Sequence, residues 1–91
     1  MKSLNTVLQK FFKDSGLEEP MKRYRVFQDW PELVGERVAR VTTPQRVTDG
    51  VLFVRVKNDT WRHELLFYKI EILRTIQEKL GSESIRDIVW F

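Results

Sequence analysis

The sequence predicts a single α+β domain over residues 1–91, with its elements in the order α-α-β-β-α-β. Residues 51–57 alternate between two faces, as a strand does, and Asp49-Gly50 just before them is a strong hairpin-turn signal. Helical periodicity flanks this hairpin on both sides. A chain of 91 residues, 42% of them hydrophobic, has room for one core. Helices should therefore cover one face of a three-stranded sheet.

The N-terminal segment, residues 1–16, is expected to be an amphipathic helix. Ser3 can cap its start, and Gly16 supplies a left-handed stop. The apolar side chains recur at helical spacing and are Leu4, Val7, Leu8, Phe11 and Phe12. We expect this apolar face to pack on the domain's own core rather than on a partner.

A second helix, within residues 18–30, should be interrupted at Pro31, because proline removes a helical hydrogen bond. Asp29 and Glu32 have the spacing of a capping box, which predicts a fresh start there and a short helix to about residue 40. Gly35 within that helix suggests the close approach of another backbone.

The hairpin around Asp49-Gly50 supplies two strands. Pro44 cannot donate to a ladder, so the first strand either lies at an edge or starts after this residue. One face of the second strand is apolar and comprises Leu52, Val54 and Val56. The opposite face comprises Phe53, Arg55 and Lys57.

A long third helix is expected to begin at Asn58, Asp59 or Thr60, each a good N-cap, and to end before Gly81. Its predicted core stripe comprises Trp61, Leu65, Tyr68, Ile72 and Ile76. Residues 84–91 are β-branched and aromatic, which predicts a closing strand that returns parallel after the helical crossover.

Catalytic chemistry finds little support in this sequence. The chain has one histidine, no cysteine and no glycine-rich phosphate loop. His63 and Glu64 are helix neighbours and point about 100° apart, so they do not form a catalytic pair. We therefore expect no enzyme activity, no cofactor, no metal and no small-molecule substrate.

The absence of cysteine suits a reducing compartment, so we expect a cytoplasmic protein. No apolar run approaches the ~18 residues of a membrane span. Charges inside the apolar pattern of residues 1–16 argue against a secretion signal. We expect no membrane association.

Two basic surfaces are candidates for nucleic acid. The net charge of +3 permits an anionic partner without demanding one. The first is the cluster Lys22, Arg23 and Arg25 around Tyr24, for which a plainly solvated helix face is the alternative. The second is the strand face, which consists of Phe53, Arg55 and Lys57 and could be extended by Arg46 and by Arg86 or Trp90.

An aromatic ring between basic side chains on an open sheet is typical of single-stranded nucleic-acid binders, because bases stack while the cations follow the backbone. The alternative is a sheet face that is simply covered or charged. A third candidate surface is the far face of the long helix, formed by His63, Phe67, Ile70 and Arg74. We expect the N-terminal helix to cover it; otherwise it would bind a protein partner.

Three runs of sequence resemble the DciA family of bacterial proteins: residues 30–44 (WPELVGERVARVTTP), 49–65 (DGVLFVRVKNDTWRHEL) and 85–89 (IRDIV). The matching positions are Trp30, Val34, Gly35, Ala39, Thr42 or Thr43 with Pro44, Asp49, Gly50, Leu52, Val54, Val56, Trp61, Glu64, Leu65 and residues 85–88. The family's motifs span about two thirds of the chain. Most of the matched residues are expected in the core.

The resemblance implies a KH-like domain that binds the replicative DNA helicase and single-stranded or forked DNA, and assists helicase loading. A working KH domain clamps nucleic acid with a Gly-x-x-Gly loop, which this sequence lacks. Nucleic acid would therefore use another surface, and the strand face becomes the leading one. Many family members continue past this domain as a flexible tail. Here we expect the folded part to make any contacts that the tail makes in relatives.

Two alternatives stay open. One is a protein-interaction adaptor that binds the helicase and has no affinity for nucleic acid. The other is an RNA-binding KH-like protein, which the missing loop disfavours. The sequence also leaves self-association open.

Overall fold

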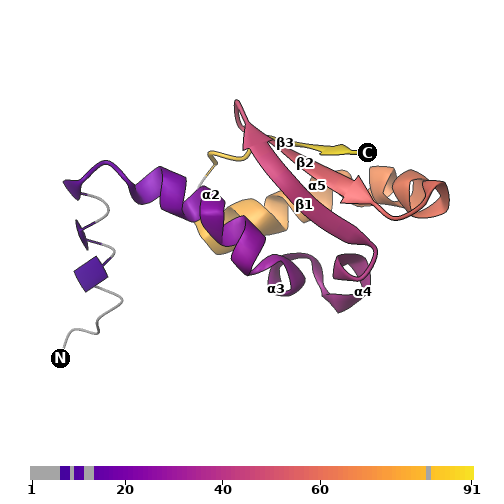
Figure 1. Cartoon of the computed structure of the whole chain (residues 1–91), viewed down its shortest axis with the longest axis horizontal. Coiled ribbons are helices and arrows are strands. Elements are labelled where there is room, and N and C mark those ends of the chain that lie inside the picture. Colours follow the sequence, from indigo (N-terminus) through magenta and orange to yellow (C-terminus); the bar gives the residue numbers. More distant parts are fainter. Residues whose placement is uncertain (1–6, 9, 12–13, 82) are drawn as a thin grey trace.

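The computed structural model describes residues 7–8, 10–11, 14–81 and 83–91. It confirms the α+β class and is consistent with a KH-like fold. The elements are α2 (Glu18–Gln28), α3 (Trp30–Val34), α4 (Glu36–Ala39), β1 (Thr42–Thr48), β2 (Val51–Val56), α5 (Asp59–Leu80) and β3 (Asp87–Trp90). The sheet has the order β1-β2-β3, with β1 antiparallel and β3 parallel to β2. Figure 1 shows α5 running along one face of this sheet.

The hairpin forms where the turn signal predicts it. Asp49 and Gly50 both have positive φ, of 51° and 79°, as a two-residue hairpin turn of the primed type requires. Pro44 lies inside β1, which is an edge strand, and the pairing register shifts between Pro44 and Arg46. The edge position therefore accommodates the missing N–H, and the bulge follows it directly.

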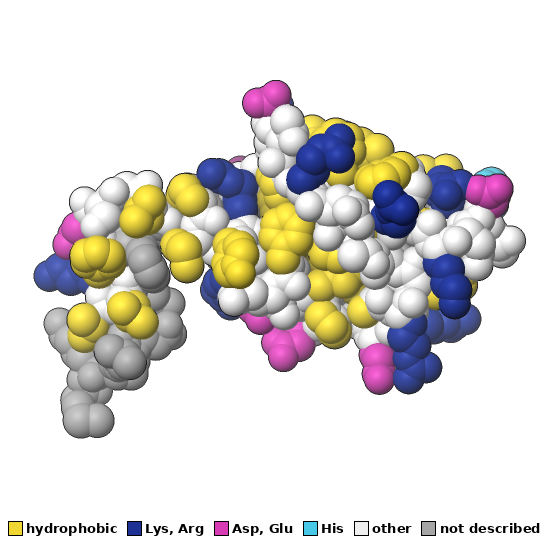
Figure 2. Space-filling view, in the orientation of Figure 1, with side chains coloured by type: hydrophobic (Ala, Val, Ile, Leu, Met, Phe, Trp, Pro, Cys, Tyr) yellow, Lys and Arg dark blue, Asp and Glu magenta, His cyan; other side chains and the backbone are white. Residues whose placement is uncertain are grey.

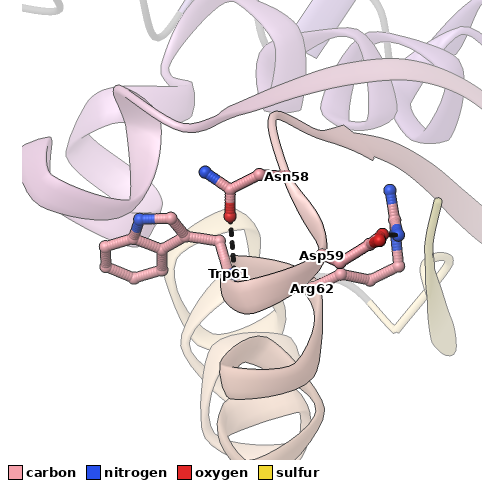
Figure 3. A network of polar contacts seen from close by, with 4 residues as sticks. All are labelled: Asn58, Asp59, Trp61 and Arg62. Atoms are coloured by element: carbon pink, nitrogen blue, oxygen red, sulfur yellow. Dashed lines mark hydrogen bonds and ion pairs between the residues drawn. The ribbon is translucent and has the colours of Figure 1, made fainter.

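Helix α5 begins and ends at its predicted caps. Asn58 is the N-cap, and its side-chain oxygen accepts a hydrogen bond from the Trp61 backbone N–H at 2.9 Å (Figure 3). Gly81 ends the helix in a left-handed conformation with φ of 65°. The parallel pairing of β3 with β2 confirms the predicted crossover.

The core lies between the sheet and the helices. Its central strand contributes Leu52, Val54 and Val56, as the alternation predicts. The buried hydrophobic side chains are Val26, Trp30, Leu33, Leu52, Val54, Val56, Leu65, Ile76, Leu80, Ile85, Ile88 and Trp90.

Trp30 joins three elements at one end of this core. Its indole Nε1 donates to Thr42 Oγ1 at 2.9 Å, and that hydroxyl donates onward to the Val38 carbonyl at 2.7 Å. Trp30 is 4% exposed and Thr42 is 6% exposed. The relay thus links α3, α4 and β1 while satisfying polar groups that burial would otherwise leave unpaired.

Three local expectations are wrong. The chain does break at Asp29, but the Asp29 side chain makes no capping hydrogen bond and instead pairs with Arg25 at 3.5 Å. A Cβ added to Gly35 would meet nothing within 4 Å, so its φ of 90° between α3 and α4, not a close backbone approach, calls for glycine. Tyr68 is 50% exposed and does not belong to the core stripe.

The described residues ahead of α2 lie apart from the sheet, beyond the N-terminal end of α2 (Figure 1). Val7, Leu8, Lys10, Phe11 and Asp14 are helical, whereas Ser3, Leu4 and Phe12 fall outside the described residues. The side chains of Val7, Leu8 and Phe11 are 54%, 43% and 58% exposed. The expectation that this face packs on the core is therefore wrong for these three side chains.

Candidate nucleic-acid interface and partner surfaces

The face of the sheet opposite α5 carries alternating aromatic and basic side chains. Since Leu52, Val54 and Val56 point into the core, the residues between them point outward. Arg46 on β1 lies opposite Phe53 in the register, and backbone hydrogen bonds continue past β3 to Phe91. We call this the outer sheet face, and it comprises Arg46, Phe53, Arg55, Lys57 and Phe91. Basic and hydrophobic side chains stand side by side over the strands in Figure 2.

Two guanidinium groups stack on rings of the outer sheet face. The Arg46 Cζ lies 4.1 Å from the centroid of the Phe53 ring, and the Arg55 Cζ lies 5.7 Å from that of Phe91. Such contacts are worth about 0.5–1 kcal/mol at exposed sites, so they are readily exchanged for another stacking partner. The arrangement places two aromatic rings and the positive charges that stack on them on the same face of the sheet.

Of the proposed extensions of this face, only Arg46 joins it. Trp90 is 7% exposed and points into the core, so its assignment to the outer face is wrong. Arg86 turns to the hairpin, where Nε and Nη2 donate to the Asp49 carbonyl at 3.1 and 2.7 Å. Phe91 was missed, although the two-residue period from buried Ile88 places Trp90 inward and Phe91 outward.

An acidic side chain on β3 is neutralised by a lysine of α5. Asp87 Oδ1 lies 2.8 Å from Lys69 Nζ and also accepts from the Ile88 backbone N–H. The hydrogen bond from Lys69, with that from Ile88, lowers the pKa of Asp87 below its ordinary value. The carboxylate therefore stays ionised and paired, and its charge is balanced close to the outer sheet face.

The basic cluster on α2 does not share an element with the outer sheet face. Lys22 and Arg23 are half-buried, and the Lys22 ammonium donates to the Gly81 carbonyl at 3.3 Å, which ties α2 to the end of α5. Arg25 is exposed and forms the ion pair with Asp29. Part of this cluster therefore holds helices together rather than only facing solvent.

The predicted far face of α5 is open to solvent. Phe67 and Ile70 are 72% and 70% exposed, so the expectation that an N-terminal helix covers this face is wrong for the described residues. The His63 and Phe67 rings meet edge to face at 5.3 Å. Leu66, 58% exposed, joins them and was missed, although it lies one turn from Ile70. We call this surface the exposed α5 face, and it comprises His63, Leu66, Phe67, Ile70 and Arg74.

A groove of about 670 Å³ lies between α3–α4 and the first half of α5. Its lining residues are Val34, Arg37, Val38, Thr60, Trp61, Glu64, Leu65, Tyr68, Glu71 and Ile72. The Trp61 indole extends from the first turn of α5 towards α4, drawn in pale purple (Figure 3). Asp59 and Arg62 pair on the other side of that turn (Figure 3). Arg37 lies over this indole, 5.6 Å from its centroid. We call this hollow the α5 groove.

No three His, Asp or Glu side chains among the described residues are grouped so that they could hold a metal ion. Within the same part of the chain, no helix combines the length and the apolar character that a membrane crossing needs.

Comparison with known proteins identifies the family. The model of the family described as "Dna[CI] antecedent, DciA" matches residues 3–90. Among curated relatives, UPF0232 proteins of Corynebacterium glutamicum and Streptomyces coelicolor are each 30% identical over 94% of this chain. One from Mycobacterium tuberculosis is 24% identical over 93% of it. The chain spans about half the length of these relatives, namely 48%, 46% and 46%. With a match along nearly its whole length, this chain belongs to the DciA family.

Proposed function

We propose that this domain is a non-catalytic DNA-replication accessory protein of the cytoplasm. It binds the replicative DNA helicase and single-stranded or forked DNA, and so assists helicase loading. Family membership supports the replication role. The outer sheet face supports the affinity for DNA, and the exposed α5 face supports a protein contact.

The stacked pairs on the outer sheet face carry the DNA part of this proposal. Phe53 and Phe91 are flat surfaces for bases, and Arg46, Arg55 and Lys57 are cations for phosphates. When a base displaces the guanidinium from a ring, that arginine becomes available to the backbone a few ångströms away. Binding of this kind tolerates sequence, because every base has an aromatic face.

Replacing both Arg55 and Lys57 with alanine should weaken single-stranded DNA binding and make it less salt-dependent. Loss of two phosphate contacts lowers the slope of log K against log salt by roughly 1.4 on single strands. Fluorescence anisotropy with a labelled oligonucleotide at several salt concentrations measures both effects. The control is Arg40→Ala with Arg74→Ala, which removes the same charge from exposed sites on other elements. Equal losses in the two variants would exclude the outer sheet face as a specific site.

One observation favours the adaptor without nucleic-acid affinity. Phe53 is half-buried beneath Arg46, so its ring already has a stacking partner. A domain that binds the helicase but neither single-stranded nor forked DNA would be this adaptor. Tighter binding to an RNA of the same sequence would instead indicate the RNA-binding class.

Changing Phe67 and Ile70 to aspartate should reduce helicase binding by at least about tenfold. Both side chains are exposed, so the fold should tolerate the change, and loss of a central apolar anchor commonly costs 2 kcal/mol or more, roughly thirtyfold. A pull-down with the replicative helicase of the same organism measures the loss. Tyr24→Asp on α2, at a side chain 53% exposed, is the matched control. Unchanged helicase binding in the double variant would place the contact elsewhere.

A further inference from the structure

The α5 groove combines an apolar floor with an acidic rim. Val38 and Leu65 contribute to the floor. Glu64, Tyr68 and Glu71 follow one another at helical spacing along α5, and all three are exposed. The Arg37 guanidinium lies over the Trp61 ring at one side of the groove. The groove therefore suits an apolar side chain with a positive charge beside it.

The N-terminal segment has the complementary chemistry. Val7, Leu8 and Phe11 present exposed apolar surface, and Lys10 is exposed beside them. Over residues 1–16 the sequence holds three lysines, at positions 2, 10 and 13, and one acidic residue, Asp14. Figure 2 shows hydrophobic side chains exposed both on this segment and on α2.

We propose that the N-terminal segment of one copy of this chain docks into the α5 groove of a second copy. Phe11 and its apolar neighbours lie on the groove floor, and Lys10 lies near the carboxylates of Glu64 and Glu71. The positive charge of the segment favours the groove over the exposed α5 face, because that face carries Arg74 and His63 and no acidic residue.

The proposed contact joins two different surfaces of the chain, the N-terminal segment and the α5 groove. The described residues of the segment lie beyond the start of α2, whereas the groove lies at α3–α4, past the end of that helix (Figure 1). Two copies close such a contact around a two-fold axis when each provides one segment and accepts the other. The smallest closed assembly is a dimer with two equivalent docked segments.

Light scattering after size-exclusion chromatography, over a range of protein concentrations, tests this assembly. The native sequence should change from monomer to dimer as concentration rises. Phe11→Glu, and separately Glu64→Arg with Glu71→Arg, should each weaken dimerisation by at least about tenfold, because each brings like charges together. Tyr24→Glu and Glu78→Arg, exposed positions outside the contact, should dimerise as the native chain does. Circular dichroism checks that every variant is folded.

Mixing the two kinds of variant gives the sharper readout. The Phe11→Glu chain keeps a native groove, and the groove variant keeps a native segment, so a mixed pair retains one sound contact. Capture of an untagged variant by the tagged one should therefore exceed capture of either variant by itself. A native chain that is monomeric at every concentration, or variants that dimerise undiminished, would overturn the proposal. So would a mixture that captures no more than its separate components.

Discussion

Replacing Gly50 with alanine should lower the free energy of unfolding by about 2–5 kcal/mol. A left-handed backbone costs a residue with a Cβ about 1–2 kcal/mol, and Gly50 has φ of 79°. The added Cβ would also lie 3.0 Å from the Ser84 carbonyl oxygen and 3.0 Å from Arg86 Nε. That carbonyl has little room to move, because the Arg86 N–H donates to the Gly50 carbonyl at 2.8 Å. Crowding of this kind adds about 1–3 kcal/mol.

Thermal unfolding followed by circular dichroism measures the loss, which corresponds to a decrease in Tm of roughly 8–40 °C for a domain of this size. Gly81→Ala is the matched control. Gly81 has a similar φ of 65°, but a Cβ there meets nothing within 4 Å, so only the strain of about 1–2 kcal/mol should appear. Equal destabilisation in the two variants would contradict the contribution assigned to Ser84 and Arg86.

Trp30→Ala should destabilise the domain by about 3–5 kcal/mol, the usual range for removing a buried large aromatic side chain. The substitution empties a core position that is 4% exposed and removes the donor to Thr42. Urea unfolding measures the change. Trp30→Phe keeps most of the ring, and Thr42 still donates to the Val38 carbonyl, so a loss of only about 1 kcal/mol is expected.

A double-mutant cycle separates the Trp30–Thr42 hydrogen bond from packing. Thr42→Val leaves the buried indole N–H without its acceptor, whereas the Val38 carbonyl still accepts from the Val41 N–H, and the change should cost about 1–3 kcal/mol. Combined with Trp30→Phe, the cost should fall below the sum of the single changes, because the indole donor is then absent as well. Strict additivity would show that the relay contributes little.

The parts of the fold that depend on local rules follow from the sequence. Asp49-Gly50 specifies its turn by backbone conformation alone, and Asn58 and Gly81 specify the ends of α5 in the same way. The alternation through Val54 likewise determines which side of β2 is buried. These signals act over a few residues, so distant packing leaves them unchanged.

The errors concern features that tertiary contacts decide. Helical spacing places Tyr68 on the same stripe as Leu65, but the neighbouring helices leave an open groove beside it. Arg86 looks like an exposed strand residue until the parallel register brings it to the Asp49 carbonyl. The exposure of Phe67 depends on where the N-terminal segment lies, and periodicity contains no information about that.

For the candidate sites, the sequence shows which side chains share a face of a strand, but not which side chains of other elements they contact. Phe53, Arg55 and Lys57 share a face because the strand period requires it. The stacking of Arg46 on Phe53 depends on the bulge after Pro44, which aligns the two residues across the hairpin. Phe91 joins through pairing with β2, and that pairing links residues far apart in the chain.

The strand order also has a consequence for how the chain folds. The β1–β2 hairpin is local and can form within microseconds. In contrast, β3 must wait until the chain between Val56 and Asp87, with α5 inside it, brings it back alongside β2. Because closing such a loop loses chain entropy before any contact compensates, this parallel pairing should be a late event in folding. Until it happens, the inner side of β2 lacks Ile88 and Trp90, and the growing core is exposed along that edge.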